Sequence, residues 1–499
     1  MRLRLTLALL TMTCSGCELI RPVVVKPPPT PSSYSTASEL STELPQPSSA
    51  PEGGVPSPRP SKEGVPAQPV ERVTQDAVWW TAFADPALDT AIQECFGDNL
   101  VLREVRELIY ENQLDPNVPQ GWWYPLQVGI LNPAGLSHVV ANANLPPAPP
   151  TRAEYNLANV GFGLTYQVDL FGALGAQRRA GLNFAEQQRQ LTEGRIQDLA
   201  VRITQVWFDI LEARALRDLT LRQIDYNKEL LRLIRARFEQ HLTPRLVVLQ
   251  QEQLLVNLES QVPLIATRNA LLNSELKALL GRVPTPADDV IPLDRQLPDL
   301  PPPPKLGTPG DLNVNTPEMR LAELRVAEVE HRINANLASW LPTIQLVGNV
   351  GALKVGLSEP ALAESVVGVN LTWALFDGRR VTEYMRLPIQ LQRREIQYQL
   401  ALHTAIGRVQ DAVVREENEA TSLRSLRAQV QLGQQLLDEA RRLFEQGHSD
   451  YLTVLTALTN LVGLERASLQ AQRLLLNHRV EVYRSLGGTW SRDVTLKRE

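Results

Sequence analysis

Two segments of the chain alternate apolar with small or polar residues, the pattern of a β-strand that has one apolar face. They run from Val160 to Val168 and from Val367 to Leu375. Nine residues at about 3.3 Å each span roughly 30 Å, and a strand of this length tilted by about 45° covers most of a ~25 Å apolar membrane layer. The pattern therefore predicts membrane strands. The apolar positions are Val160, Phe162, Leu164, Tyr166 and Val168, then Val367, Val369, Leu371, Trp373 and Leu375.

A half-buried strand in a soluble sheet is the commoner origin of such alternation. The number of strands argues against that alternative, because one further strand beside each segment gives only four strands in about 420 ordered residues. Four strands make no sandwich, and so few strands remove their sheet edges most easily by closing a barrel with copies of the same chain.

Very long helices are predicted directly after each alternating segment. From Gly172 to Gln240 there is no proline, and these 69 residues form a rod of about 100 Å as a helix. Each rod ends in a short turn, at His241–Pro244 and at Gly447–Asp450, after which the chain runs back. A soluble coiled coil is the alternative, but it leaves the strands unexplained. Apolar positions step by three and four, as in coiled coils, at Ile196, Leu199, Ile203, Val206, Ile210 and Ala213, and at Leu423, Leu426, Val430, Gly433, Leu437, Ala440 and Phe444.

The chain is one unit of about 200 residues written twice. "RFEQHLTPRLVVL" matches "LFEQGHSDYLTVL" at a constant offset of 206, which pairs Phe238 with Phe444 and Leu246 with Leu452. Each copy is predicted to contain a short helix, two strands, a long helix, a turn and a shorter helix. The predicted fold class is therefore mainly α with membrane β, built from duplicated helical hairpins and four strands per chain.

The N-terminus contains "TMTCSGCELI", with two of only three cysteines in the chain, Cys14 and Cys17. Arg2 and Arg4 followed by a short apolar run have the order of a secretory signal, and the run is about half as long as a membrane-spanning helix. The residues just before Cys17 resemble a bacterial lipobox, although Cys14 occupies the usual aliphatic position. This resemblance implies cleavage before Cys17 and lipidation of that cysteine, and Glu18 after it fits sorting to the outer membrane.

Residues 21–70 hold 13 of the 37 prolines and one aromatic residue, so they cannot bury enough apolar area to fold and are predicted to be a flexible tether. The expected division of the chain is a signal peptide at 1–16, a lipidated tether at 17–76, a first repeat at 77–281, a proline-rich connector at 282–315, a second repeat at 316–490 and a tail at 491–499.

Charge and motifs argue against several other classes of protein. The formal net charge of −5 becomes about −7 once Arg2 and Arg4 are cleaved off, which gives no support to nucleic-acid binding. The six histidines lie far apart, with no HExxH, and there is no glycine-rich phosphate loop and no GxSxG. We therefore expect no enzyme activity, no cofactor and no metal.

The chain resembles the TolC-like outer-membrane efflux proteins, in particular the lipoprotein branch that serves RND-type pumps. "WWTAFADPALDTAI", "YQVDLFG", "LFDGRR" and "FEQGHSDYLTVLTA" occur in the family's order. The resemblance implies a homotrimer with a 12-stranded barrel in the outer membrane and an α-barrel in the periplasm. It also implies a passive duct that works with a periplasmic adaptor and an inner-membrane pump. The alternatives are a type I secretion exit channel and, less favoured, a periplasmic adaptor lipoprotein.

The resemblance also assigns roles to the two hairpin turns and the helices that follow them. In the family the turns contact the adaptor, which implies this role for Leu242 and Thr243, and for Gly447, His448, Ser449 and Asp450. Asp450 has a second, compatible role, because an acidic residue after a turn can cap the returning helix.

The predicted pore gate departs from the family pattern. Relatives often carry a carboxylate in a "VLDA"-like stretch, whereas this chain has "VLTA", with Thr456 at the acidic position and Thr453 one turn earlier. Gln250 is the corresponding residue of the first copy. The resemblance therefore implies a gate of hydroxyl groups rather than a ring of negative charge.

Overall fold

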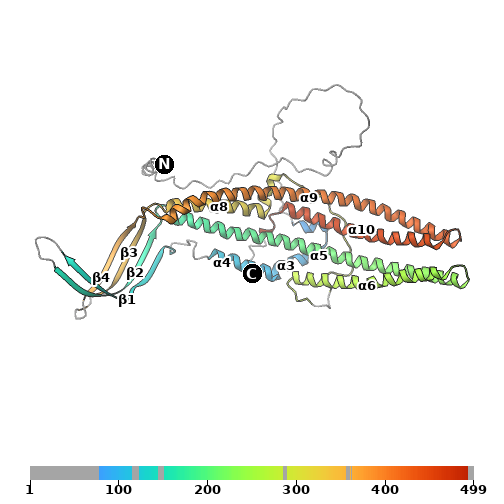
Figure 1. Cartoon of the computed structure of the whole chain (residues 1–499), viewed down its shortest axis with the longest axis horizontal. Helices are drawn as coiled ribbons and strands as arrows, with labels where there is room; N and C mark the ends of the chain where they lie inside the picture. Colours follow the sequence, from blue (N-terminus) through green and yellow to red (C-terminus); the bar gives the residue numbers. More distant parts are fainter. Residues whose placement is uncertain are drawn as a thin grey trace, which may run out of the picture. The chain divides into compact units, whose positions relative to one another are not determined.

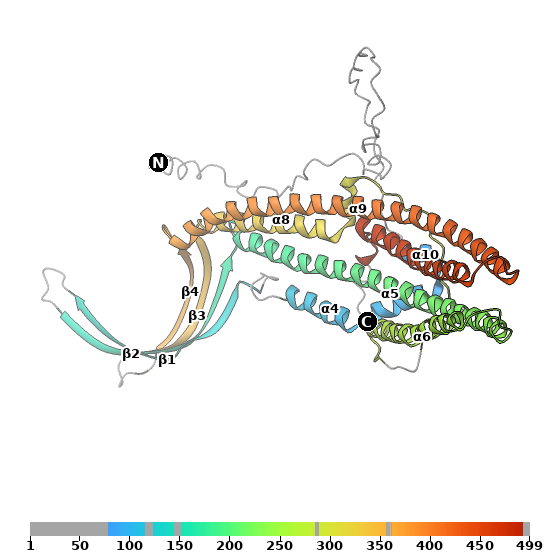
Figure 2. The same ribbon diagram turned by 45° about the vertical axis from the view of Figure 1, so that its right-hand side comes forward.

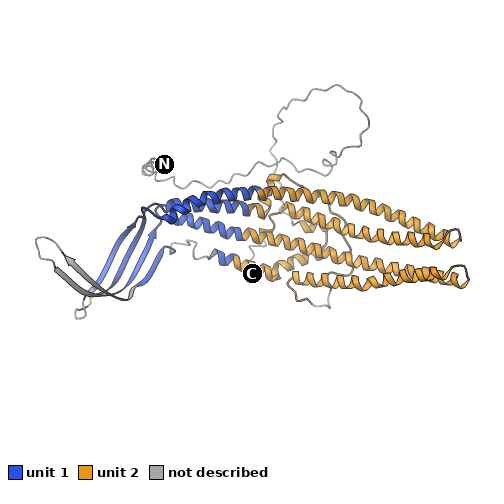
Figure 3. Ribbon diagram, in the orientation of Figure 1, with its two compact units in different colours: residues 1–27, 109–188, 321–399 blue, residues 28–108, 189–320, 400–499 orange. Residues whose placement is uncertain are grey.

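The computed structural model of the chain describes residues 78–114, 123–143, 151–284, 289–355, 360 and 362–492. These residues fall into two compact units (Figure 3). Unit 1 draws on 109–188 and 321–399, and unit 2 draws on the described parts of 28–108, 189–320 and 400–499. Each unit therefore takes residues from both copies of the repeat. Cys17 and residues 115–121 of the "LDPNVPQG" segment lie outside the described residues.

The order of elements is the one that the duplication predicts (Figure 1). Each copy runs through short helices, two strands, one very long helix and a shorter returning helix. The first copy contains η3 (Trp79–Phe83), α3 (Pro86–Asp98), α4 (Leu100–Gln113), β1 (Leu126–Ala143), β2 (Thr151–Val168), α5 (Ala173–Glu239) and α6 (Arg245–Leu279). The second contains η4 (Pro309–Asp311), α7 (Leu312–Asn315), α8 (Pro317–Ala338), β3 (Thr343–Val355), β4 (Leu362–Thr372), α9 (Gly378–Glu445) and α10 (Tyr451–Leu486).

The two very long helices are confirmed, since α5 has 67 residues, as its proline-free run predicts, and α9 has 68 with Pro388 inside it. α5 lies beside α6, and α9 lies beside α10, in both views (Figure 2). Among the described residues, no helix has an apolar stretch that is long and uncharged enough to cross a membrane.

The four strands of unit 1 form one antiparallel sheet in the order β1-β2-β3-β4. The second alternating segment was predicted to remain extended to Leu375, and this is wrong, because β4 ends at Thr372. Thr372 pairs with Thr343, the first residue of β3, so no partner strand continues beyond it. The indole of Trp373 instead donates a hydrogen bond to the carbonyl oxygen of Trp340, at 3.0 Å.

The register places most of the large apolar residues of the four strands on one face of the sheet. Tyr166 pairs with Leu126 and Leu346, and Leu346 pairs with Val369. Because directly paired residues of antiparallel strands share a face, the period-two pattern of each strand adds to that of its neighbour. This apolar face is exposed, with Phe162 at 68% and Val369 at 68%. Its other exposed large members include Val128, Ile130, Val160, Leu164, Val350, Val367 and Leu371.

The "DLFG" and "LFDG" motifs lie where a strand gives way to a long helix, and each supplies an N-terminal cap. The two carboxylate oxygens of Asp169 accept hydrogen bonds from the backbone N–H groups of Leu174 and Gly175. Asp377 accepts one from the N–H of Arg379 at the start of α9. Capping satisfies N–H groups that have no partner within the helix. The aspartates of both motifs thus have a local structural role, which is to cap the start of the long helix that follows.

An aromatic cluster forms the core of unit 2 and explains the "WW" motif at the start of the ordered sequence. Trp79 stacks on Tyr483 with ring centroids 5.6 Å apart, and Trp80 meets Trp490 edge-on at 4.7 Å. The indole N–H of the buried Trp207 donates to Asp85 at 3.0 Å. The two ends of the described chain are therefore packed into the same core.

Candidate functional site

The two hairpin turns, both in unit 2, have the same hydrogen-bonding pattern. The N–H of Leu242 donates to the carbonyl of Arg237, and the N–H of His448 donates to that of Leu443, both at 2.9 Å. A residue with positive φ precedes each donor, His241 at 61° and Gly447 at 75°. This is the Schellman arrangement that commonly ends helices. The offset of 206 pairs His241 with Gly447, so the duplicated turns keep one geometry.

Capping of the second returning helix by Asp450 is confirmed. Its side chain accepts a hydrogen bond from the backbone N–H of Leu452 at the start of α10. The corresponding residue of the first turn is Pro244, which makes no side-chain cap. The first turn therefore has histidine in the left-handed conformation and no capping carboxylate, while the second has glycine and a cap.

The predicted adaptor-contacting residues differ in exposure. Leu242 is 63% exposed, and Gly447, His448 and Asp450 are also exposed. Ser449 is half-buried and Thr243 is buried, at 8% exposure.

Sequence reasoning missed two exposed leucines near the turns. Leu246 and Leu452 are related by the same offset of 206 and are 63% and 59% exposed. A signal was available, because the same apolar residue recurs at equivalent places beside the two turns.

The predicted gate residues lie within the first two turns of the returning helices. Thr453 and Thr456 are exposed on α10, and Gln250 is half-buried on α6. The Thr456 hydroxyl donates to the carbonyl of Leu452 at 2.8 Å, within its own helix. That hydroxyl proton is thus engaged in the chain, while the oxygen keeps a lone pair free to accept a hydrogen bond.

A buried polar network next to these residues was not predicted. The side-chain amide of Gln251 donates to the backbone and side-chain oxygens of Asn227 at 3.1 and 2.8 Å, and its oxygen accepts from the Tyr451 hydroxyl. Burial raises the pKa of Tyr451 to about 12, so the hydroxyl stays a donor. The network joins α5, α6 and α10. Nothing in the sequence indicated it, because the offset of 206 pairs Gln251 with Ala457 and Tyr451 with Arg245.

Further polar contacts connect the two hairpins away from the turns. Glu212 of α5 is buried and pairs with Arg268 of α6 at 2.7 Å and with Arg473 of α10 at 3.7 Å. Nearer the turns, Gln223 of α5 donates to Glu465 of α10 at 3.0 Å. A buried carboxylate is stable only where cations and donors compensate its lost hydration. The two arginines from different helices provide that compensation at Glu212.

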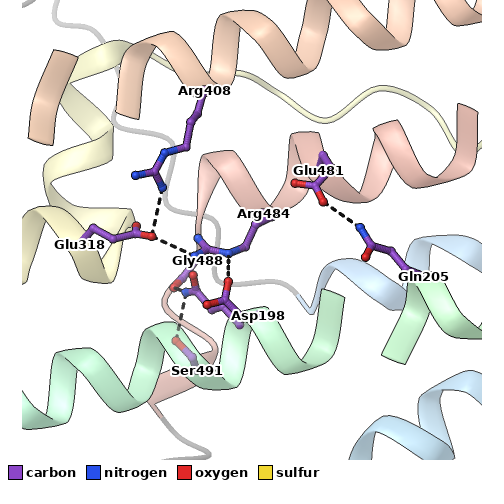
Figure 4. Close-up of polar contacts among 9 residues, drawn as sticks. Asp198, Gln205, Glu318, Arg408, Glu481, Arg484, Gly488 and Ser491 are labelled. Carbon is purple, nitrogen blue, oxygen red and sulfur yellow. Dashed lines mark hydrogen bonds and ion pairs between the residues drawn. The ribbon is translucent and has the colours of Figure 1, made fainter. Parts of the chain in front are cut away.

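A charged network joins four helices at the end of the hairpins opposite the turns (Figure 4). Arg484 of α10 contacts Asp198 of α5 at 2.6 Å and Glu318 of α8 at 2.9 Å, and Arg408 of α9 reaches Glu318 at 3.3 Å. Burial opposes ionisation of Glu318, but the two arginines outweigh it and hold the pKa of that carboxyl below its ordinary value. Beside this charged network, the side-chain amide of Gln205 donates a hydrogen bond to the carboxylate of Glu481 at 2.7 Å.

A buried arginine of α10 holds part of the proline-rich connector. Arg479 is 2% exposed, and its guanidinium donates to the carbonyls of Pro301 and Pro302 and pairs with Glu416 of α9. These two carbonyls are available as acceptors because the segment around them is in neither a helix nor a strand. The connector is therefore fixed against α9 and α10 of unit 2.

These features define a class of protein. The chain combines a sheet that has an exposed apolar face with two helices of nearly 70 residues, each paired with a shorter one. This combination is typical of a helix-rich channel that strands anchor in a membrane. The sequence profile described as "Outer membrane efflux protein" matches residues 139–282 and 308–488, more than half of the chain. The chain belongs to this family, which excludes the adaptor alternative, and it is an outer-membrane efflux channel.

Individual relatives agree over most of the chain. The toluene efflux pump outer membrane protein TtgF of Pseudomonas putida is 25% identical over 438 residues, 84% of this chain and 87% of the relative. The probable outer membrane lipoprotein SilC of Salmonella typhimurium is 24% identical over 431 residues, 83% and 89% of the two chains. The solved structure of the outer-membrane channel OprN has the same fold, with a TM-score of 0.71 at 21% identity, covering 85% of this chain and 95% of that one.

Proposed function

We propose that the chain is the exit duct of a tripartite efflux system, in which a homotrimer receives substrates from a periplasmic adaptor and an inner-membrane RND-type transporter. The observation that carries the proposal is the four-stranded sheet with an exposed apolar face and two free edges. Apolar residues in that number are stable on a surface only against lipid or another protein. The duct is passive, and its energy comes from the transporter.

Three copies close the barrel. Among the described strands, β1 and β4 each pair on one side only, because they stand at the ends of the sheet order. Unpaired strand edges are templates for pairing, and in lipid every backbone group needs a partner. Joining β4 of one copy to β1 of the next satisfies both edges and gives a 12-stranded barrel.

The hairpin turns are the docking surface for the adaptor. Leu242 is exposed at the first turn, and Leu246 and Leu452 project from the first turn of each returning helix. Exposed apolar side chains at equivalent places on both hairpins favour contact with an apolar surface of a partner.

The test replaces Leu246 and Leu452 together with aspartate. We expect drug resistance in a strain that depends on this duct to be lost, because the charges cannot be desolvated in an apolar contact. The heat-modifiable trimer should persist, since both side chains are already in water.

Ser260→Asp is the matched control, because Ser260 is an exposed residue of α6 farther from the turn, and it should leave resistance unchanged. Full resistance in the double variant would contradict the docking surface. Loss of the trimer would instead show that the leucines stabilise the assembly itself. Bulky residues at Gly447 are a poorer test, because its φ of 75° makes any side chain strained there.

The gate is uncharged at the level of Thr456. The three copies bring Thr453, Thr456 and Gln250 together at the closed end as a ring of hydroxyl and amide groups. The exposure of both threonines supports this placement.

The mature chain is anchored by lipid at Cys17. The lipobox-like sequence supports this, and so does the name of the relative SilC, which is that of an outer membrane lipoprotein. Mass spectrometry of the mature N-terminus tests it, and we expect a diacylglyceryl cysteine at residue 17. An unmodified start at another residue would refute the anchor and leave the duct standing.

A further inference from the structure

The face of the sheet opposite the apolar one is made mostly of small and uncharged polar residues, with three apolar side chains (Val347, Leu353 and Val366) and one carboxylate. Glu364 of β4 is the single carboxylate on this face among the strand residues whose side chains are described. The others there are Gln127, Gly129, Gly161, Gly163, Thr165, Gln167, Thr343, Gln345, Val347, Asn349, Gly351, Leu353, Val366, Gly368, Asn370 and Thr372.

Two glycines lie directly across from Glu364 on this face. Glu364 pairs directly with Gly351 of β3, and Gly351 pairs with Gly161 of β2. The two glycines approach so closely that a Cβ added to Gly161 would lie 2.7 Å from the carbonyl oxygen of Val350. The two neighbouring strands therefore place no side chain directly across from the carboxylate.

Glu364 is half-buried and makes no ion pair with any residue whose side chain the structure describes. It lies near the start of β4, at the end of the sheet away from α9. Among the described side chains of this face Glu364 is the one charged group, and such a carboxylate sets the electrostatic potential in the space before it.

We propose that Glu364 is the residue that makes the duct selective for cations. The inference rests on the proposed threefold barrel, in which the apolar face meets lipid and the opposite face lines the lumen. Three carboxylates then form a ring near one mouth of the barrel, which is how cation channels build charge filters. Selectivity therefore lies in the strands, whereas the helix end that carries Thr456 has no acidic residue at this position.

Planar-bilayer recordings of the purified protein in a KCl gradient test the filter. We expect the wild type to prefer K⁺ over Cl⁻, Glu364→Gln to lower the permeability ratio about twofold or more, and Glu364→Lys to reverse the preference. Thr456→Ala should leave the ratio unchanged. The preference of the wild type should weaken between ~0.1 M and ~1 M salt, because the screening length falls from about 10 Å to about 3 Å.

A thiol pair tests the placement of the side chain separately from its charge. Glu364 and Ser365 are adjacent and lie on opposite faces of β4. A cationic methanethiosulfonate should reduce the conductance of Glu364→Cys and leave Ser365→Cys unchanged. The wild type is the background control, since Cys95 is fully buried.

The possible outcomes separate the two proposals. Open channels whose ion preference does not respond to Glu364→Gln or Glu364→Lys would overturn the filter and leave the duct intact. Equal block of the two cysteine variants, or block of Ser365→Cys alone, would place Glu364 outside the lumen. Absence of any trimer or conductance from the wild type would contradict the proposed function itself.

Discussion

At the scale of single residues, Gly161 and Gly351 lie where the backbones of two strands approach so closely that no larger side chain fits. A Cβ on either glycine would lie 2.7 Å from a carbonyl oxygen of the neighbouring strand and 2.9 Å from the other glycine's Cα. Gly161→Ala therefore forces the strands apart, and we expect overpacking to cost about 1–3 kcal/mol per chain. The heat-modifiable trimer, followed by electrophoresis across a temperature series, should dissociate at a lower temperature.

Gly129→Ala is the matched control for this prediction. Gly129 lies on the same face of the sheet in β1, and a Cβ there meets nothing within 4 Å. Its trimer should dissociate at the wild-type temperature. Equal destabilisation by both variants would mean that any added methyl group on this face is harmful, and that the close approach of β2 and β3 is not the cause.

The same scale shows which site residues could be predicted from sequence. Asp450 was predictable as a cap, because capping depends only on residues next to it in the chain. The hydrogen bonds of Gln251 to Asn227 and Tyr451 were not, because they join three helices whose neighbours no local pattern specifies. The left-handed backbone conformation of His241 could not be predicted from histidine itself, and it is understood by its equivalence to Gly447 in the second turn.

At the scale of elements, the interiors were predictable and the ends were not. The faces of β2 and β4 follow from the period of two, and the lengths of α5 and α9 follow from coiled-coil spacing and, in α5, from the lack of proline. The end of β4 at Thr372 depends on where β3 begins, which is a tertiary fact. The register shift of β1 between Leu131 and Gly135 likewise could not be predicted from the alternation of apolar and polar residues.

At the scale of the whole molecule, duplication and spatial division cut the chain differently. Each copy of the repeat supplies two strands to unit 1 and one hairpin to unit 2. The sequence pattern shows the two copies directly. The units instead depend on contacts between residues of different copies, such as the pairing of β2 with β3 inside unit 1. In the part of the chain that the structure describes, the sheet takes strands from both copies and has its two unpaired edges at β1 and β4.

Proline substitution tests whether the open edge at β4 is used by another copy. Backbone N–H groups of successive strand residues point to opposite sides, so one of Val369 and Asn370 faces β3 and the other faces the free edge. Proline is tolerated on an unused edge because no ladder bond is lost there. If β4 pairs with β1 of a second copy, Val369→Pro and Asn370→Pro should both abolish the heat-modifiable trimer in electrophoresis. A wild-type amount of trimer from either variant would mean that the edge of β4 is not hydrogen-bonded, and that the barrel closes by another route.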